Sequence, residues 1–316
     1  MPKFTVFLTV VGLQERRGEW ANVQDLCWSV NTHKARRSQW RRYDRFCMDY
    51  GLIPLPASTE TVCLYITYLA RSCCYVTIKN YISGLWALHD YWGTPHVDPS
   101  VFLIKSTMTG AKRLLGCETV QAEPLSPQDM IKLYKCLDIS NPKDLQLWCA
   151  LTVAYRCLLR VSHITTSPHT IKAGDVRFTS SGMDISIRSS KTIQFRERVQ
   201  TIPVVRAGVS PLCPTNCLPG YIRLFNLSPS DQLFPYTYNQ FAALFKRLCT
   251  KAKLVGKYST HSMRRGSATF LSSFLPLHDV KSYGDGKSWS VLLYISDSYH
   301  ARRTKDQLVA QRLSHF

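Results

Sequence analysis

Apolar residues recur at helical spacing through the first third of the chain. In residues 32–50 they fall every three or four positions, and Gly51 and Pro54 follow as terminators. Ser58 is placed to cap a second helix through residues 62–69. Two more helical stretches follow, over about 76–92 and 102–115. The pattern predicts a helical domain over residues 19–116, after an N-terminal tail of residues 1–18.

The pattern changes in the rest of the chain. A linker is expected over residues 117–126, where Ser126 can cap a helix that starts at Pro127. A long apolar helix is predicted over 144–160, and helical spacing returns from about 238. Between them, three β-rich segments separated by turns predict a small antiparallel sheet, over residues 175–178, 183–188 and 198–204. The sequence therefore predicts a mainly α second domain, residues 127–316, which contains a small sheet.

The charge of the chain indicates a polyanionic partner. Lys and Arg total 40 against 21 for Asp and Glu, a formal net charge of +19. Such an excess is typical of proteins that bind nucleic acid, less often of proteins that bind anionic membranes. The alternative is a basic protein that its charge merely keeps soluble.

Basic residues of the first domain are arranged for contact with a DNA backbone. Arg37, Arg41 and Arg45 are four residues apart and share one face of a predicted helix. Each guanidinium can pair with a phosphate in a forked geometry. The alternative is an ordinary solvated helix face. The candidate DNA-binding residues are Arg36, Arg37, Arg41, Arg42, Arg45 and Lys79.

The twelve cysteines do not indicate a disulfide scaffold. Most lie in apolar stretches, where a free cysteine behaves as a small hydrophobic residue. Cys213 and Cys217 alone have possible ligand spacing, and no second pair follows at a zinc-like interval. Residues 1–13 lack a clear cleavage site and are too short to span a bilayer. We therefore expect an intracellular protein without structural metal, with the nucleus favoured over the cytoplasm.

Four local motifs of the second domain contain residues suited to phosphate chemistry. Arg160 lies in Leu-Leu-Arg-Val-Ser-His, at the predicted end of the long helix, and Lys191 lies in a turn between two strands. His261 and Arg264 belong to His-Ser-Met-Arg-Arg-Gly, which opens another helix. Tyr294 follows a Gly-Asp-Gly-Lys-Ser turn.

The order of these motifs resembles the tyrosine recombinase (phage integrase) family. The likeness covers most of the chain, because the first domain also resembles that family's helical core-binding domain. It is most similar to recombinases of eukaryotic mobile elements, which carry pieces much like LLRVS, SKTIQF-x-ER and HS-x-RRG-x-ATF here. The resemblance implies a DNA strand transferase without metal or other cofactor. It also implies tetramers on paired DNA sites, in which a C-terminal segment, here the residues after Tyr299, passes between protomers.

The chemistry of strand transfer gives each matching residue a role. Arg160 and Arg264 can clamp the non-bridging oxygens of a pentacoordinate phosphate. Tyr294 can attack the phosphorus and leave again, which stores the energy of the broken bond. Lys191 can give a proton to the departing 5′-oxygen. His261, one helical turn before Arg264, can hydrogen-bond the phenol or the phosphate.

Three positions depart from the family's pattern or compete with it. Tyr299 is a rival nucleophile, but the family's His or Trp lies eight or nine residues before its Tyr, which points to Asp285 or Gly286 and so to Tyr294. Gly286 stands where the resembling sequences have an aromatic residue, and Asp285 would repel a phosphate unless a cation paired with it. His163 stands where the family more often has an acidic residue.

Two alternatives to an active recombinase follow. One is a catalytically impaired DNA-binding protein derived from a mobile element, which Gly286 favours. The other is a nicking-closing topoisomerase-like enzyme, which shares the Arg, Lys, His and Tyr chemistry but not the first domain.

Overall fold

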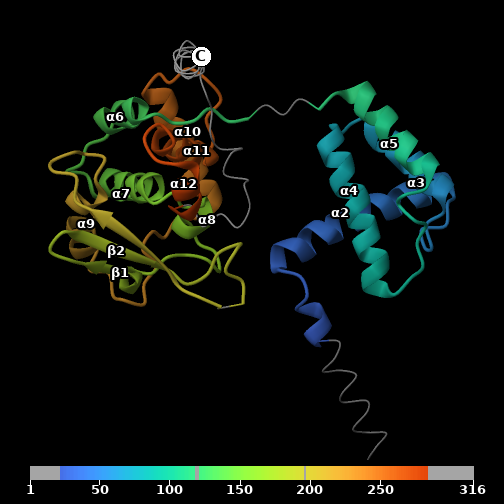
Figure 1. Ribbon diagram of the computed structural model, residues 1–316, viewed down its shortest axis with the longest axis horizontal. Coiled ribbons are helices and arrows are strands. Elements are labelled where there is room, and N and C mark those ends of the chain that lie inside the picture. Colours follow the sequence, from blue (N-terminus) through green and yellow to red (C-terminus); the bar gives the residue numbers. More distant parts are fainter. Residues whose placement is uncertain (1–21, 118–120, 196, 284–316) are drawn as a thin grey trace, which may run out of the picture. The chain divides into compact units, whose positions relative to one another are not determined.

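The chain folds into two compact units, Met1–Thr119 and Val120–Phe316, which we describe separately (Figure 1). The structure is a computed structural model and describes residues 22–117, 121–195 and 197–283. The boundary between the units falls inside the predicted linker of residues 117–126. None of the described helices is long and apolar enough to cross a membrane.

The first unit is built from the four helices that the apolar spacing predicts: α2 (Val30–Tyr50), α3 (Thr59–Ala70), α4 (Tyr75–Trp92) and α5 (Phe102–Leu115). The Ser58 hydroxyl caps α3 by accepting a hydrogen bond from the Thr61 N–H, as its position predicts. Gly51 ends α2 in the left-handed conformation, with φ 62°. The apolar faces meet in a core whose fully buried aromatic rings, Tyr43 and Tyr65, contact edge to face.

The second unit is mainly helical, as predicted. Its helices are α6 (Pro127–Lys135), α7 (Pro142–Arg156), α8 (Val161–Ile164), α9 (Leu218–Leu224), α10 (Tyr238–Lys251), α11 (His261–Leu271) and α12 (Leu277–Tyr283). Ser126 forms a full capping box with Asp129 at the start of α6. The short helices α8 and α9 do not appear in the sequence pattern, because segments this short carry too few apolar positions to show a period.

The predicted antiparallel sheet is confirmed. It comprises β1 (Val176–Phe178), β2 (Gly182–Ile187) and β3 (Gln200–Val205), in the order β1-β2-β3. Ile185 pairs with Val176 on one side and with Ile202 on the other. The inward side chains of β2 and β3 alternate with more exposed ones and join the helical core.

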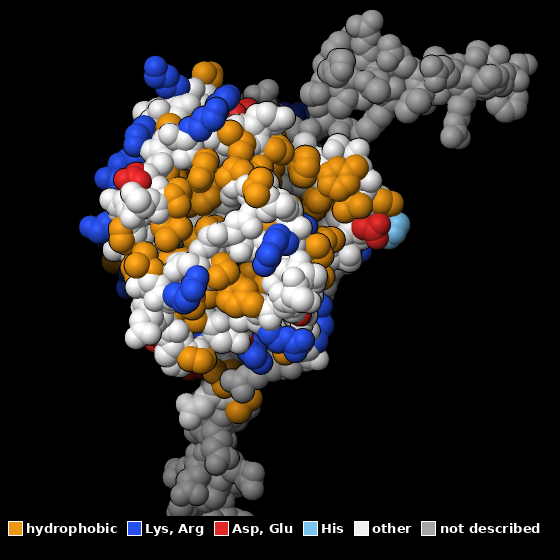
Figure 2. Space-filling model, turned by 90° about the vertical axis from the view of Figure 1, so that its left-hand side faces the viewer, with side chains coloured by type: hydrophobic (Ala, Val, Ile, Leu, Met, Phe, Trp, Pro, Cys, Tyr) orange, Lys and Arg blue, Asp and Glu red, His pale blue; other side chains and the backbone are white. Residues whose placement is uncertain are grey.

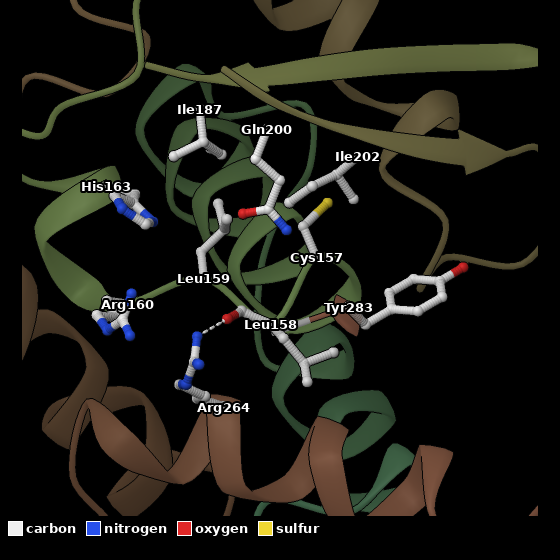
Figure 3. Close-up of a pocket in the computed structure, with 10 residues that line it drawn as sticks. All are labelled: Cys157, Leu158, Leu159, Arg160, His163, Ile187, Gln200, Ile202, Arg264 and Tyr283. Atoms are coloured by element: carbon white, nitrogen blue, oxygen red, sulfur yellow. Dashed lines mark hydrogen bonds between the residues drawn. The ribbon is translucent and has the colours of Figure 1, made fainter. Parts of the chain in front are cut away.

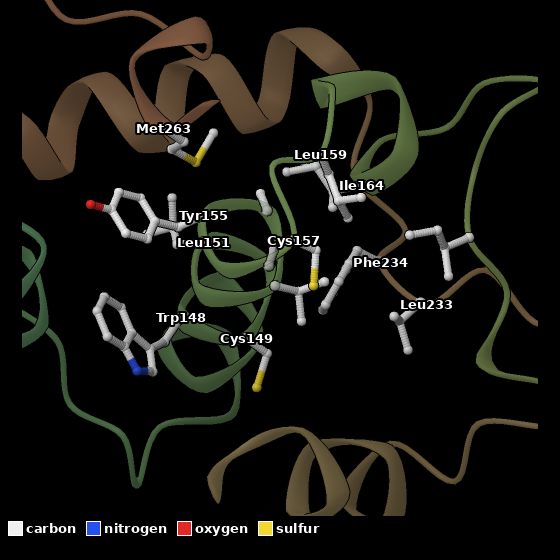
Figure 4. Packing of buried hydrophobic residues seen from close by; sticks show 14 of the residues in the cluster. Trp148, Cys149, Leu151, Tyr155, Cys157, Leu159, Ile164, Leu233, Phe234 and Met263 are labelled. Atoms are coloured by element: carbon white, nitrogen blue, oxygen red, sulfur yellow. The ribbon is translucent and has the colours of Figure 1, made fainter. Parts of the chain in front are cut away.

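Helix α7 runs through the centre of this core (Figure 4). Its residues 147–155 are all buried, as the continuous apolar run predicts. The indole of Trp148 donates a hydrogen bond of 3.1 Å to the Pro211 carbonyl, which satisfies its buried polar atom. All twelve cysteines of the chain lie within the described residues, and none of them forms a disulfide.

The end of the long helix differs from the prediction. The helix stops at Arg156 rather than at Arg160, and Leu158 takes a left-handed conformation with φ 48°. Leu158 and Leu159 are buried beneath the turn. Apolar residues in a buried turn look like a continuing buried helix in sequence, which explains the difference.

The last part of the predicted linker packs onto α11. Leu125 is fully buried, and its N–H donates to the Ser262 carbonyl at 3.0 Å. Gly266 allows this close approach, because a Cβ there would lie 1.8 Å from the Leu125 carbonyl oxygen. Residues 121–126 therefore belong structurally to the second unit.

Gly266→Ala is expected to destabilise the second unit by about 3 kcal/mol, because backbone rather than a flexible side chain opposes the new methyl group. Thermal unfolding by circular dichroism measures the effect. The control is Gly220→Ala in α9, where nothing lies within 4 Å of the new Cβ and a small gain in stability is expected. Equal melting temperatures for the two variants would contradict the close contact.

Candidate active site

Arg160 is positioned by the tight turn between α7 and α8. It is the N-cap residue of α8, in an extended conformation with φ −76° and ψ 149°. The turn before it is held by the Leu159 N–H, which donates to the Ala154 carbonyl at 3.0 Å. Arg160 therefore lies outside the long helix, on the turn that follows it. Its partly buried side chain lines a small pocket (Figure 3).

Arg264 reaches the same pocket from α11. Its side chain is 5% exposed, and its guanidinium donates a hydrogen bond to the Leu158 carbonyl oxygen in the turn before Arg160. The positive φ of Leu158 marks this turn. One arginine thus binds the backbone that presents the other. Figure 3 shows both guanidinium groups at the same end of the pocket.

His163 lines this pocket too. It lies on α8 and is 4% exposed, and its backbone N–H donates to the Arg160 carbonyl at 2.9 Å. The resembling family more often has an acidic residue here. An imidazole can be neutral or positive but never negative, so His163 does not supply the negative charge that a carboxylate would place beside Arg160.

His261 is the first residue of α11, one turn before Arg264, as the motif predicts. Its ring remains accessible to solvent. Partial desolvation, followed by the positive charges of Arg264 and Arg265, lowers the pKa of His261 below its ordinary value. The imidazole is therefore neutral at pH 7 and has a lone pair with which to accept a hydrogen bond.

Lys191 occupies a tight turn between β2 and β3, as predicted. Its side chain is exposed. Lys191 does not line the pocket of Arg160 and Arg264, which we call the arginine pocket. The turn is closed by the Ser190 hydroxyl, which accepts hydrogen bonds of 3.1 Å from the backbone of Thr192 and Ile193. The structure thus places Lys191 at the tip of a structured turn. Tyr294, Asp285 and Gly286 lie outside the described residues.

His169 lies close to the candidate site, although the sequence pattern does not single it out. It shares a hydrogen bond of 2.7 Å with the Ser189 hydroxyl, close to the Lys191 turn. Burial, followed by the charge of Arg160, lowers the pKa of His169. It therefore stands between the Arg160 turn and the Lys191 turn. No spacing in the sequence signals it, since it lies in a loop.

The candidate DNA-binding residues of the first unit divide into two groups. The first group has exposed side chains that can reach a ligand: Arg37, Arg41, Arg45 and Lys79. Arg36 instead hydrogen-bonds Gln39 at 3.0 Å. Arg42 donates to the Ser72 hydroxyl at 2.7 Å and stacks over the Tyr81 ring at 5.4 Å. Arg36 and Arg42 are thus partly engaged in packing within their own unit.

The second unit also presents a basic surface. Figure 2, which faces the side that carries β1 and α9, shows Lys and Arg side chains spread over an otherwise apolar and uncharged surface with few carboxylates. The high net charge is therefore not confined to the first unit.

The chain resembles known recombinases in both sequence and structure. It is 24% identical over 265 residues to an integrase/recombinase XerD homologue of Selenomonas ruminantium, covering 79% of this chain and 75% of the relative. No known family model matches the chain.

Solved integrases share its fold. The Tn1549 transposon integrase in complex with transposon right-end DNA is 14% identical, with a TM-score of 0.62 over 90% of this chain and 95% of that one. A lambda integrase dimer bound to a COC′ core site is 14% identical, with a TM-score of 0.59 over 88% and 76%. XerH bound to a palindromic difH substrate is 13% identical, with a TM-score of 0.58 over 80% and 70%.

The chain therefore has the fold of the solved integrases and is similar in sequence to the XerD homologue.

Proposed function

We propose that the protein is a site-specific DNA recombinase that breaks and rejoins DNA through a 3′-phosphotyrosyl intermediate. The observation that carries the proposal is the pocket in which Arg160 and Arg264, from distant segments of the chain, come together. Two adjacent guanidinium groups form a strong binding site for a phosphate and stabilise the extra charge of its transition state. Because the chain is similar in sequence and in fold to recombinases and integrases, we take this phosphate to be one of the DNA backbone.

In the proposed reaction, the Tyr294 oxygen attacks the scissile phosphorus. The bond between that oxygen and the 3′-phosphate forms while the bond from phosphorus to the 5′-oxygen breaks. Arg160 and Arg264 neutralise the non-bridging oxygens, and Lys191 gives its proton to the departing 5′-oxygen. The reverse attack by a 5′-hydroxyl of another strand completes the exchange and releases the tyrosine. None of these steps requires a metal ion.

His261 suits the role of hydrogen-bond acceptor for the phenol. Its lowered pKa keeps the imidazole neutral at pH 7, so that it can accept the proton of the tyrosine as attack begins. A protonated imidazole could only donate to the phosphate. A neutral imidazole also keeps one N–H that can donate to the phosphate, so both roles are open to His261.

The proposal extends to partners and context. Duplex DNA would bind through phosphates contacted by Arg37, Arg41, Arg45 and Lys79 of a core-binding first unit, so binding should weaken steeply with salt. Tetramers on paired sites, a eukaryotic mobile element as the source, and the nucleus as the compartment follow from the sequence resemblance.

A second candidate function is that of a catalytically impaired DNA-binding protein. Two substitutions in the family pattern favour it, His163 beside Arg160 and Gly286 in place of an aromatic residue. Both bear on activity rather than on the fold that the sequence predicts. Both would weaken the hold on the scissile phosphate, the first by removing a negative support and the second by removing a packing and hydrogen-bonding side chain.

The experiment that tests the proposal uses nicked suicide duplexes to which the protein has been shown to bind. A cleaved strand on such a duplex cannot be religated, so the adduct accumulates and is seen on a denaturing gel. Adduct from the wild type supports the recombinase. Adduct from Gly286→Trp alone identifies a disabled enzyme. No adduct from either protein overturns the catalytic proposal, and relaxation of supercoils that lack any specific site would indicate the topoisomerase-like alternative.

A further inference from the structure

A second and larger cavity opens beside the arginine pocket, on the same helix. It has a volume of about 390 Å³ and lies wholly within the second unit. Its walls come from residues 121–122 near the start of the second unit, from the loop before α11 and from α11 itself. The lining side chains that matter here are Gln121, Lys257, Tyr258, Ser259, His261 and Arg265.

The chemistry of this cavity is that of an anion site. Lys257 and Arg265 are basic side chains, and no carboxylate is among the described residues that line the cavity. Glu123 and Asp129 raise the pKa of Tyr258, after burial, but neither residue lines the cavity. Tyr258 and Ser259 add hydroxyl donors, and the Tyr258 ring adds an apolar wall. An anionic group with a flat apolar neighbour, such as a nucleotide, fits this lining.

The cavity is also rigidly built. The guanidinium of Arg265 donates to the Gln121 side chain, which holds it at the wall. The Glu123 N–H donates to the Lys257 carbonyl at 2.8 Å, which fixes the loop that bears the lysine. A site held in place before binding spends less free energy on ordering its side chains.

Helix α11 connects the two sites. Arg264 lines the arginine pocket, and Arg265, the next residue, lines the larger cavity. Successive residues of a helix point about 100° apart, so the two guanidinium groups serve neighbouring spaces. A DNA strand likewise presents its phosphates at short, regular intervals.

We propose that the cavity of Lys257 and Arg265 is a second phosphate site, which holds a backbone phosphate adjacent to the one clamped by Arg160 and Arg264. The inference rests on the proposed function in taking DNA as the ligand. Two neighbouring phosphates of one strand, bound on either side of one helix, would fix the direction of that strand as well as its position. The scissile phosphate would then present one defined face to the nucleophile.

The first test measures how DNA affinity depends on salt. The probe is a short fluorescent duplex, and the variant is Lys257→Ala, which removes an exposed side chain and leaves the backbone bond to Glu123 in place. Loss of one phosphate contact lowers the slope of log K against log salt by about 0.9. The control is Arg223→Ala on α9, an exposed cation that lines neither site and should leave the slope unchanged.

The second test locates the phosphate. Neutral methylphosphonates are placed one at a time around the cleaved phosphate of the suicide duplex. One neighbouring position is expected to weaken wild-type binding about tenfold, and to have no further effect on Lys257→Ala. Additive effects at every position, or a slope equal to that of the wild type, would overturn the second site.

The two proposals fail separately. An adduct from the wild type together with unchanged salt slope in Lys257→Ala leaves the recombinase standing without the second site. A lowered salt slope in Lys257→Ala without any adduct leaves the phosphate site standing on a protein that does not cleave.

Discussion

Tyr294→Phe is expected to abolish the covalent protein–DNA adduct while leaving DNA affinity within about twofold of the wild type. The phenol oxygen is the only heavy atom removed, and it is the atom proposed to bond to phosphorus. DNA affinity comes mainly from phosphate contacts made by basic side chains, which the substitution does not touch. The measurement is adduct formation on the nicked suicide duplex, with affinity determined on the same DNA.

Tyr299→Phe provides the matched control for this result. The two tyrosines are five residues apart, and both are candidates by position alone. The spacing of the Gly-Asp-Gly-Lys-Ser sequence before them points to Tyr294, so we expect Tyr299→Phe to form adduct as the wild type does. Adduct that persists in Tyr294→Phe and disappears in Tyr299→Phe would reverse the assignment.

Arg160→Lys is expected to slow adduct formation by a factor of about 10² to 10³, the usual cost of one lost transition-state donor. Lysine keeps the positive charge but cannot make the forked contact with two phosphate oxygens. The arginine is partly exposed and is not one of the residues of the hydrophobic core, so the fold should be unaffected. Single-turnover cleavage rates measure the effect.

The outcome for Arg160 is read against two other variants. Arg177→Lys, an exposed residue of β1 that does not line the pocket, should cleave at the wild-type rate. Arg264→Lys should lose both rate and stability, because the Arg264 guanidinium also binds the buried Leu158 carbonyl. Equal rates for Arg160→Lys and Arg177→Lys would remove Arg160 from the transition state.

Much of the fold could be read from local sequence signals. The Ser58 and Ser126 hydroxyls begin helices by accepting hydrogen bonds from backbone N–H groups of the first turn. Pro127 suits the first helical position because it has no N–H that would be left unpaired there. These effects need no distant partner. Strand alternation likewise predicts the sheet, because a half-buried strand repeats every two residues. The order of Arg160, Lys191, His261 and Arg264 could also be read directly, since it is a property of the chain.

Other features depend on contacts between distant segments, and only the tertiary structure decided them. The long helix ends at Arg156 because Leu158 turns the chain and Arg264 binds its carbonyl, a contact that local periodicity does not contain. Residues 121–126 join the second unit because Gly266 has no side chain to exclude Leu125. His169 comes close to Ser189 from a loop, where no period in the sequence marks it. The sequence by itself thus determined the helices and strands and the order of the chemical groups along the chain. Packing determined where the long helix ends and which groups meet. The reason is that close contact between distant segments depends on the shape of the whole unit.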